Sequence, residues 1–570
     1  MKIITTKQMK ALESESVNHG VSLAKLMDNA GKALADFICS LYDKKEINCE
    51  KNITFLAGSG NNGGDCFVAA RELVYCGFNV SVICVCDKPQ TNIALDAFNK
   101  MPSDRINIIE GFKSKHTKKT IEAAELSFMS VNGSSNENSA ANQAQMEQIQ
   151  LAEKKRTDAV FNTISKSDVI VDGVFGTGFR GKLDEEIISF FKAADSKIKI
   201  SVDVPSGGNC TYGSAAEGIF NADYTVAFGF LKSGMTQYPL KQYCGKIKVC
   251  EIGIPDKALE LLNDEADMQL ADESCFSNLI KPRKPDSHKG DFGRLLIIAG
   301  SRNMRGACVM AAESALRCGV GIVCTASVEE TINTASIKIP ESILLPLDCD
   351  YDGFMLYENN LDLLKKELGK ADAVLFGCGL GVTNDTIKLT EFIIENAECP
   401  VIIDADGINC LAADVKLLKK KRSDIILTPH PAEMSRLIGK SVSDIQSDRI
   451  NTALSFAEEY NVTVVLKGAG TVTAQSQKCI VNTTGNSGMS KGGSGDVLAG
   501  IVSSLSAQGY TPFEAASFGA YIHGMAGDFA AEKLGVQFML PSDIINELSA
   551  VFKNLSRNKG NTAQALCSVA

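Results

Sequence analysis

The feature that most constrains this chain is an alternation of short apolar runs with longer amphipathic stretches, which occurs twice along its 570 residues. In the first half the apolar runs lie at 53–57, 80–86, 169–172, 198–204 and 224–228. Runs that are apolar throughout are typical of parallel strands covered on both faces. Spacings of three and four residues predict a helix ahead of the first strand, formed by Leu23, Leu26, Met27, Ala30, Leu34, Phe37, Ile38 and Leu41. Residues 1–255 are therefore predicted to form a doubly wound α/β domain.

A second α/β series follows, with apolar runs at 295–299, 322–325, 373–376, 401–404, 425–427 and 464–466 and a hairpin at 471–474 and 479–481. The acidic, weakly patterned stretch 256–285 is predicted to be a linker. The second domain is expected over 286–556, followed by a polar tail at 557–570. Residues 127–156 are mostly polar and have no aromatic side chain from Asn132 onward, which predicts a surface insertion, disordered or partly helical, with no chemical role.

Charge and composition exclude several classes of protein. The 58 Lys and Arg residues and 68 Asp and Glu residues give a net charge of −10, which argues against a nucleic-acid partner. No apolar run is long enough to cross a membrane. The 19 cysteines are scattered, without disulfide spacing or a secretory signal, which predicts reduced thiols in a cytoplasmic protein. Small-molecule partners are expected, and the protein is predicted to be a homo-oligomer, with the number of subunits left unspecified.

Three polar loops follow predicted strands in the first half. The first, GSGNNGGD at 58–65, lies between a strand and a helix, where backbone N–H groups suit a phosphate. The others are DGVFGTGFRG at 172–181 and DVPSG at 203–207. Ligands of open parallel sheets lie beyond the carboxyl ends of the strands, so the three loops are expected to converge there. They predict a site for a polar ligand, and a cation held by oxygen atoms.

Together, these three loops resemble the NAD(P)H-hydrate epimerase family, whose domain is Rossmann-like. The resemblance implies a potassium site at Asn62, Asp172 and Ser206. It implies that the following residues bind substrate: Asn61, Asn62, Gly63, Gly64, Asp65, Gly176, Thr177, Gly178, Phe179, Arg180, Gly181, Lys182 and Asp203. The catalytic acid or base is either Asp65 or Asp203, and the spacing does not choose between them. Cys66 departs from the glycine that is usual in the family.

The second half carries a longer glycine-rich loop, GNSGMSKGGSGD at 485–496, directly before a helical run. Asp496 is either a favourable helix cap or a general base that deprotonates a substrate hydroxyl beside phosphate-binding N–H groups. Asp404 and Asp406 end another predicted strand and suit either Mg²⁺ or the recognition of a hydroxyl. A loop at 467–471, KGAGT, has glycines that would let a flat ring approach the backbone.

Taken in their order along the chain, the motifs of the second half resemble the NAD(P)H-hydrate dehydratase family, which has a ribokinase-like fold. The resemblance covers residues 286–548. The resemblance implies that the hydrate contacts Ala307, Gly379, Gly381, His430 and Asp496. It implies that Lys467, Gly468, Ala469, Gly470, Thr471 and Gly495 hold an adenosine nucleotide, and that Asp496 is the catalytic base. Ala432 stands where glycine is usual, and Ser494 where threonine is usual.

Epimerase-like motifs followed by dehydratase-like motifs imply a bifunctional repair enzyme for hydrated NADH and NADPH, here called NADHX and NADPHX. The first domain would interconvert their R and S epimers. The second would phosphorylate the S hydroxyl, with Mg²⁺, and eliminate phosphate; ADP is favoured as the co-substrate and ATP is possible. One alternative is a ribokinase-type vitamin or sugar kinase with a non-catalytic, ligand-binding front domain. Another is that the front domain is a scaffold, although such a module need not keep Asp65, Asp172 and Asp203.

Overall fold

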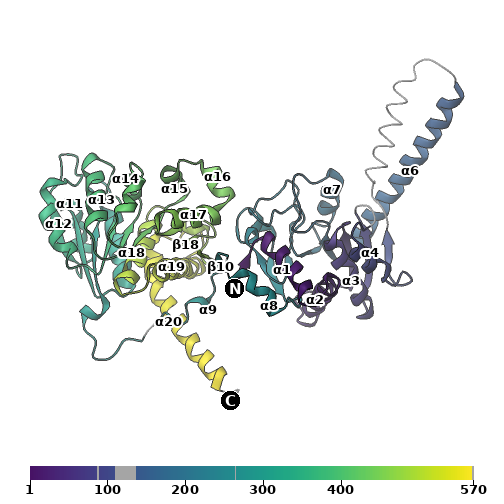
Figure 1. The fold of residues 1–570 in the computed structure, drawn as a ribbon, viewed down its shortest axis with the longest axis horizontal. Helices are drawn as coiled ribbons and strands as arrows, with labels where there is room; N and C mark the ends of the chain where they lie inside the picture. Colours follow the sequence, from purple (N-terminus) through teal and green to yellow (C-terminus); the bar gives the residue numbers. More distant parts are fainter. Residues whose placement is uncertain (86–88, 110–135, 264, 281, 568–570) are drawn as a thin grey trace. The chain divides into compact units, whose positions relative to one another are not determined.

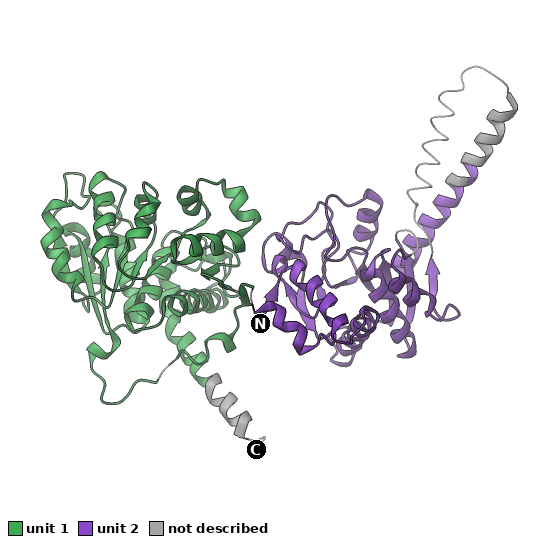
Figure 2. Ribbon diagram, viewed as in Figure 1, with its two compact units in different colours: residues 1, 265–570 green, residues 2–264 purple. Residues whose placement is uncertain are grey.

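The chain forms two compact units in a computed structural model that describes residues 1–85, 89–109, 136–263, 265–280 and 282–567. One unit comprises Lys2–Asp264, and the other comprises Met1 with Glu265–Ala570 (Figure 2). Both are built from parallel strands and helices, which confirms the predicted α/β class (Figure 1).

The unit of residues 2–264 is organised around a seven-stranded parallel sheet of order β4-β3-β2-β5-β6-β7-β9. Its strands are β2 (Asn52–Ala57), β3 (Asn79–Cys84), β4 (Asn107–Ile109), β5 (Val169–Gly173), β6 (Ile198–Val202), β7 (Tyr224–Phe228) and β9 (Lys246–Cys250). Successive side chains enter different cores: Phe55 and Val171 belong to one apolar cluster, whereas Leu56 and Ile170 belong to another. The central strands are therefore covered on both faces, which accounts for apolar runs such as Ile53 to Ala57 in β2.

The helices of this unit cover the sheet. The helix that the sequence predicts ahead of the first strand is α2. Their bounds are α1 (Thr6–Asn18), α2 (Leu23–Asp43), α3 (Asn61–Tyr75), α4 (Asn92–Asn99), α6 (Asn136–Lys166), α7 (Glu185–Ala193) and α8 (Asp256–Leu259), with 3-10 turns at Ser233–Thr236, Leu240–Tyr243 and Glu260–Leu262. A separate short pair joins β1 (Ile3–Ile4) to β8 (Leu231–Lys232). The predicted insertion at 127–156 lies partly outside the described residues, and from Asn136 onward it is helical, as α6.

The strand order places the sequence reversal of this sheet between β2 and β5. From β2 the chain proceeds outward through β3 and β4, and after β5 it proceeds the other way. The loops that follow β2 and β5 therefore diverge at one point of the carboxyl edge, where open α/β sheets bind their ligands. GSGNNGGD and DGVFGTGFRG are these two loops.

The second unit contains a ten-stranded sheet of order β10-β19-β18-β17-β16-β15-β14-β11-β12-β13. Its strands are β10 (Asp267–Leu270), β11 (Arg294–Ile298), β12 (Ile322–Val328), β13 (Ile343–Leu347), β14 (Ala373–Phe376), β15 (Val401–Ile403), β16 (Ile425–Leu427), β17 (Thr463–Leu466), β18 (Val472–Gln475) and β19 (Lys478–Val481). The predicted hairpin is confirmed, since β18 pairs with β19 antiparallel. Here the reversal lies between β11 and β14, so their loops also open toward one site.

A large apolar core lies between this sheet and α10, α18, α19 and α20. The helices of the unit are α9 (Glu273–Phe276), α10 (Arg305–Arg317), α11 (Glu329–Lys338), α12 (Leu361–Leu368), α13 (Asn384–Asn396), α14 (Asp406–Leu411), α15 (Pro431–Ile438), α16 (Val442–Ser447), α17 (Arg449–Tyr460), α18 (Ser494–Ala507), α19 (Pro512–Leu534) and α20 (Pro541–Cys567), with 3-10 turns at Lys289–Phe292, Glu358–Asn360, Val415–Lys420 and Ser487–Met489.

The structure differs from the predicted boundaries in two places. The stretch 256–285, predicted to be a linker, contains α8 of the first unit and β10 and α9 of the second. The predicted polar tail from 557 instead continues α20 as far as Cys567, and its residues include no proline that would end the helix. Among the described residues, no helix combines the length and the apolar content needed to span a bilayer.

Candidate functional site

The GSGNNGGD loop of the first unit is a close packing of two backbones. α3 begins at Asn61, so the NNGGD part of the motif forms the first turn of this helix. A Cβ at Gly58 would lie 1.9 Å from the Val174 carbonyl oxygen, and a Cβ at Gly63 would lie 2.0 Å from the Gly58 carbonyl oxygen. A side chain at Gly58 would separate the loops after β2 and β5, and a side chain at Gly63 would push α3 away from the loop after β2. The glycines therefore bring the polar side chains of both loops to one site.

The three residues predicted to hold a cation lie in one buried network. The Asp172 carboxylate, at the end of β5, accepts hydrogen bonds from the Ser206 N–H at 2.8 Å and the Ser206 hydroxyl at 2.6 Å. The Asn62 amide donates to the Phe175 carbonyl oxygen at 3.2 Å, and the Phe175 N–H donates to the Ser206 hydroxyl at 2.7 Å. Burial raises the pKa of Asp172 to about 6, while the Ser206 bonds lower it. This oxygen-rich donor set fits a hard cation.

Beside this network lies a cavity of about 720 Å³. Its lining includes these predicted substrate residues: Asn61, Asn62, Asp65, Gly176, Thr177, Gly178, Phe179, Arg180, Lys182 and Asp203. Gly63, Gly64 and Gly181 do not line it. Gly64 faces α2 instead, where a Cβ would lie 2.6 Å from the Met27 sulfur. We therefore expect Gly64 to act through helix packing rather than ligand contact.

Three ionisable residues that the sequence did not predict also line this cavity: Lys10 and Glu13 of α1, and Lys232 of β8. The ammonium of Lys232 is buried and forms an ion pair with the Asp203 carboxylate. Asp203 is held further by the Phe228 N–H, at 3.1 Å, and has a left-handed backbone, with φ of 63°. Burial, followed by the charge of Asp203, raises the pKa of Asp65 well above its ordinary value.

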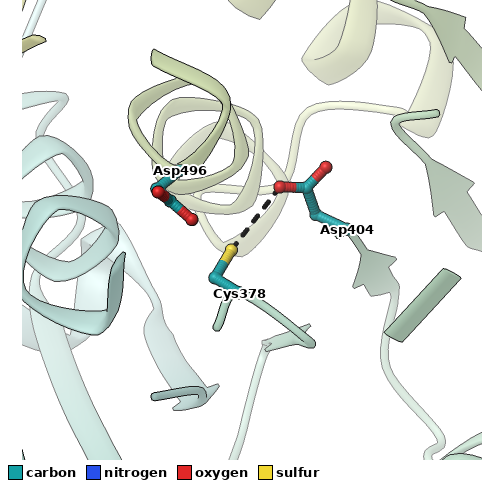
Figure 3. A group of neighbouring side chains, drawn as sticks. All are labelled: Cys378, Asp404 and Asp496. Atoms are coloured by element: carbon teal, nitrogen blue, oxygen red, sulfur yellow. Dashed lines mark hydrogen bonds between the residues drawn. The ribbon is translucent and has the colours of Figure 1, made fainter. Parts of the chain in front are cut away.

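In the second unit, Cys378, Asp404 and Asp496 form a compact group (Figure 3). Cys378 follows β14, Asp404 follows β15, and Asp496 lies in the first turn of α18. Their ligand atoms all lie within 4.8 Å of one another. The Cys378 thiol donates to the Asp404 carboxylate at 3.6 Å, the contact drawn as a dashed line in Figure 3. Three strand or helix ends from distant parts of the sequence thus meet at one point.

Lys467 brings a positive charge to this group. Its Nζ lies 2.8 Å from Asp404 Oδ1 and 3.8 Å from Glu433 Oε2. The Thr428 hydroxyl donates to the same Asp404 oxygen at 2.6 Å. Burial raises the pKa of Glu433 to about 7, whereas Lys467 lowers it. Lys467 was predicted to contact a nucleotide; its side chain contacts the carboxylates, next to the predicted catalytic base.

Asp496 is half-buried at the amino end of α18, and Gly493 before it has a φ of 101°. Burial and then the charge of Asp404 raise the pKa of Asp496 to about 6, against the lowering effects of Cys378 and Lys467. Two buried atoms beside this turn, Ser494 Oγ and His523 Nε2, lack a hydrogen-bond partner in the described part of the chain. Since buried polar atoms are normally paired, this turn suits a ligand that supplies oxygen atoms.

The KGAGT loop at 467–471 is held from behind by Arg449 of α17. Its Nη2 donates to the Leu466 carbonyl oxygen at 2.9 Å and to the Lys467 carbonyl oxygen at 3.3 Å. A Cβ at Gly468 would lie 3.0 Å from that Nη2, which explains the glycine. The Thr471 hydroxyl closes the loop by donating to the Gly468 carbonyl oxygen at 2.9 Å. The loop is thus rigid and close to the Asp404 group.

The remaining predicted hydrate residues lie on neighbouring turns. A Cβ at Gly379 would lie 2.9 Å from the Ala307 Cβ at the start of α10, so these two residues are in close contact. His430 caps α15, and its Nδ1 accepts the Ala432 N–H at 3.1 Å. Gly495 borders the carboxylate group, since its Cβ would lie 3.4 Å from Lys467 Nζ. Asp406 holds the Gly381 N–H at 2.8 Å, so its carboxylate positions that loop.

Comparison with known proteins gives a consistent result for both units. A family described as "YjeF-related protein N-terminus" matches residues 23–234, and one described as "NAD(P)H-hydrate dehydratase" matches residues 295–550. A bifunctional NAD(P)H-hydrate repair enzyme of Thermofilum pendens is 31% identical over 97% of this chain and 97% of its own length. The Escherichia coli protein of that name is 32% identical over 93% of this chain and 90% of its own length.

Solved structures resemble one half of the chain. An ADP/ATP-dependent NAD(P)H-hydrate dehydratase from Bacillus subtilis, co-crystallized with ATP and Mg²⁺, is 28% identical and covers 50% of this chain and 98% of its own, with a TM-score of 0.43.

Proposed function

This chain belongs to the family of bifunctional NAD(P)H-hydrate repair enzymes, and from that membership we propose how its two units divide the work. The unit of residues 2–264 interconverts the R and S hydrates of NADH and NADPH. The unit of residues 265–570 converts the S hydrate back to the reduced nucleotide at the expense of a nucleotide phosphate. The partners are therefore the small molecules NADHX and NADPHX.

The observation that carries the dehydratase assignment is the position of Asp496 in the first turn of α18, among Asp404, Cys378 and Lys467. As a base, Asp496 removes the proton of the substrate hydroxyl, and the hydroxyl oxygen bonds to the terminal phosphorus of the nucleotide. The bond from that phosphorus to the bridging oxygen breaks, so AMP leaves when the nucleotide is ADP. The N–H groups of residues 493–495 hold the phosphoryl oxygens. The C6–O bond of the phosphorylated hydrate then breaks, a proton leaves C5, and phosphate departs as a good leaving group.

The KGAGT loop and Gly495 are proposed to hold the nucleotide, with ADP as the favoured co-substrate. Asp404 and Asp496 are the carboxylates in reach of a Mg²⁺ ion, which would neutralise charge on the transferring phosphate. In the first unit, Asn62, Asp172 and Ser206 are proposed to hold K⁺, together with the Phe175 carbonyl oxygen. That cation would fix the loops after β2 and β5 around the substrate.

The alternative of a vitamin or sugar kinase with a non-catalytic front domain is not supported. The relatives named as bifunctional repair enzymes match the whole chain rather than its second half alone. Asp65 and Asp203 both line the cavity of the first unit, beside the hydrogen-bonded residues Asp172 and Ser206.

A mixture of R and S hydrates tests the proposal on the full chain. Without nucleotide, the protein is expected to equilibrate the two epimers, resolved by chromatography, and faster with K⁺ than with Na⁺. With ADP and Mg²⁺, absorbance of the reduced nicotinamide is expected to return for the whole mixture. Recovery of the S portion alone would contradict the epimerase assignment, and accumulation of a stable phosphorylated product would favour the kinase alternative.

The raised pKa of Asp496 predicts how dehydration depends on pH. A base works only when ionised, so the rate should fall about tenfold per pH unit as the pH drops below the Asp496 pKa of about 6. Lys467 lowers that pKa, so Lys467→Met should move the acidic limb of the kcat profile to higher pH. Lys416→Met, at an exposed position, is the matched control. An unchanged acidic limb in Lys467→Met would mean that Asp496 is not the group that titrates.

A further inference from the structure

Three carboxyl groups line the cavity of the first unit: Glu13 of α1, Asp65 of α3 and Asp203 in the turn after β6. Four cationic side chains line it as well: Lys10, Arg180, Lys182 and Lys232. Glu13 belongs to none of the three motif loops, so the sequence resemblance gives it no role. Its place in the cavity raises the question of how protons are divided among the three carboxyl groups.

The Asp203 carboxylate is already bound by other groups of the same unit. Its Oδ1 accepts the Lys232 ammonium and, at 3.1 Å, the Phe228 N–H. The same ammonium donates to the Phe228 carbonyl oxygen at 2.9 Å, and only 1% of the Lys232 side chain is exposed. An ionised carboxylate fixed by a buried cation and a backbone N–H is a poor proton carrier, because protonation would leave that cation without its counter-ion.

Asp65 and Glu13 differ from Asp203 in this respect. Neither carboxyl group has a hydrogen bond or an ion pair among the described residues, although both line the cavity. Burial and the nearby negative charge of Asp203 raise the pKa of both groups, while Lys232 lowers the pKa of both and Lys10 lowers that of Glu13. These two carboxyl groups are therefore available to bind or release a proton beside a ligand.

We propose that Glu13 is a further catalytic residue of the epimerase site and that it carries a proton in partnership with Asp65. The ion pair with Lys232 and the Phe228 N–H fix the Asp203 carboxylate beside the two other carboxyl groups. This inference rests on the proposed epimerase function of the unit and names a residue that acts in it.

The chemistry of the hydrate explains why two carboxyl groups are needed. Its hydroxyl is on C6, the carbon bonded to the ring nitrogen. A protonated carboxyl gives its proton to that hydroxyl, the C6–O bond breaks, water leaves, and the nitrogen lone pair forms a C=N⁺ bond. A water molecule then adds to the opposite face of C6 and loses a proton to the ionised carboxylate. One water leaves and one returns, and one proton is given and one taken. The two carboxyl groups exchange roles for the reverse reaction.

The same helix provides a matched control. Glu15 is two residues away on α1, and it accepts the Asn18 amide at 2.8 Å and lies 3.2 Å from the His19 imidazole. Glu15→Gln thus removes the same charge from the same helix outside the cavity. Glu13→Asp keeps the carboxyl group and tests whether an acid, rather than the shape of the side chain, is required.

The experiment measures the equilibration of purified R hydrate with S hydrate by the full chain, without nucleotide. Glu13→Gln should lower kcat on the order of 10²–10⁴-fold, the range for loss of a general acid or base, while Glu15→Gln keeps the wild-type rate. Glu13→Asp should recover part of the loss. The wild-type kcat profile should be bell-shaped, and Glu13→Gln should lose one limb. In H₂¹⁸O, the hydroxyl of the product should acquire the label.

Several outcomes would overturn the inference. If Glu13→Gln equilibrates the hydrates at the wild-type rate, or if Glu13→Asp is no more active than Glu13→Gln in folded protein, Glu13 carries no proton. If no ¹⁸O enters the product, the C6–O bond does not break. Dehydration of the S hydrate with ADP, measured on each variant, shows that the second unit remains intact. A wild-type chain that equilibrates nothing would instead contradict the epimerase function itself.

Discussion

Asp496→Asn is expected to lower nucleotide-dependent dehydration of the S hydrate on the order of 10²–10⁴-fold, the usual effect of removing a general base. Asparagine has nearly the shape of aspartate but cannot accept the hydroxyl proton. The first turn of α18 and its N–H groups should remain, so nucleotide binding, measured by calorimetry, should change little. Because Asp404 raises the pKa of Asp496, the same change removes a repulsion between two carboxylates and should not destabilise the unit.

Asp362→Asn is the control, since Asp362 lies on the exposed surface of α12. It should dehydrate at the wild-type rate. Epimerisation by the first unit should be unaffected by either change, which separates a catalytic defect from a general loss of folded protein. A dehydration rate in Asp496→Asn close to that of Asp362→Asn would remove Asp496 from the mechanism.

Lys232→Met should have the largest effect on the first unit. It leaves the Asp203 carboxylate without its cation, and loss of one partner of a buried ion pair typically costs about 3–5 kcal/mol. Unfolding of the first unit by urea should move to lower concentration by a corresponding amount, and epimerisation should be lost. Dehydration of the S hydrate, by the second unit, should persist. The measurements are circular dichroism against urea and the two activities on the same preparation.

The double variant Lys232→Met with Asp203→Asn distinguishes charge from packing. If the buried charge is the cause, neutralising Asp203 should restore part of the stability lost in Lys232→Met, and the two changes should not be additive. Additive losses would show that Lys232 stabilises the unit through the packing of its aliphatic stem instead. Activity is not expected to return in the double variant, because Asp203 no longer supplies its negative charge.

The strands that the sequence predicted are those covered on both faces. β14 and β16 have the predicted bounds, and each of their residues is buried. Apart from the two-residue strands β1 and β8, the missed strands are β4, β9, β10 and β13, and each of these four ends a sheet, where only one neighbouring strand pairs with it. Their residues are partly exposed, and β13 contains a proline, so they lack the apolar runs that mark a buried strand.

The same reasoning applies to the sites. Glycine-rich loops after strands are visible in sequence because close backbone contact demands glycine, and these loops led to Asp65, Asp172 and Asp496. Glu13 and Lys232 come from a helix and a two-residue strand without such a signal. The Lys467 ammonium also reaches carboxylates 34 and 63 positions earlier in the chain, Glu433 and Asp404, a pairing that only the sheet order brings about.

The pairing of β10 with β19 has a consequence for how the protein is made. β10 is among the first parts of its unit to leave the ribosome, yet Asp267 pairs with Lys478, the first residue of the last strand, β19. At roughly 5–20 residues per second, the roughly 200 residues between them take on the order of 10–40 s to synthesise. The chain as far as Asp264 can fold during this interval, whereas β10 waits without its partner. Nascent-chain folding of the second half should therefore be completed late, when β19 emerges.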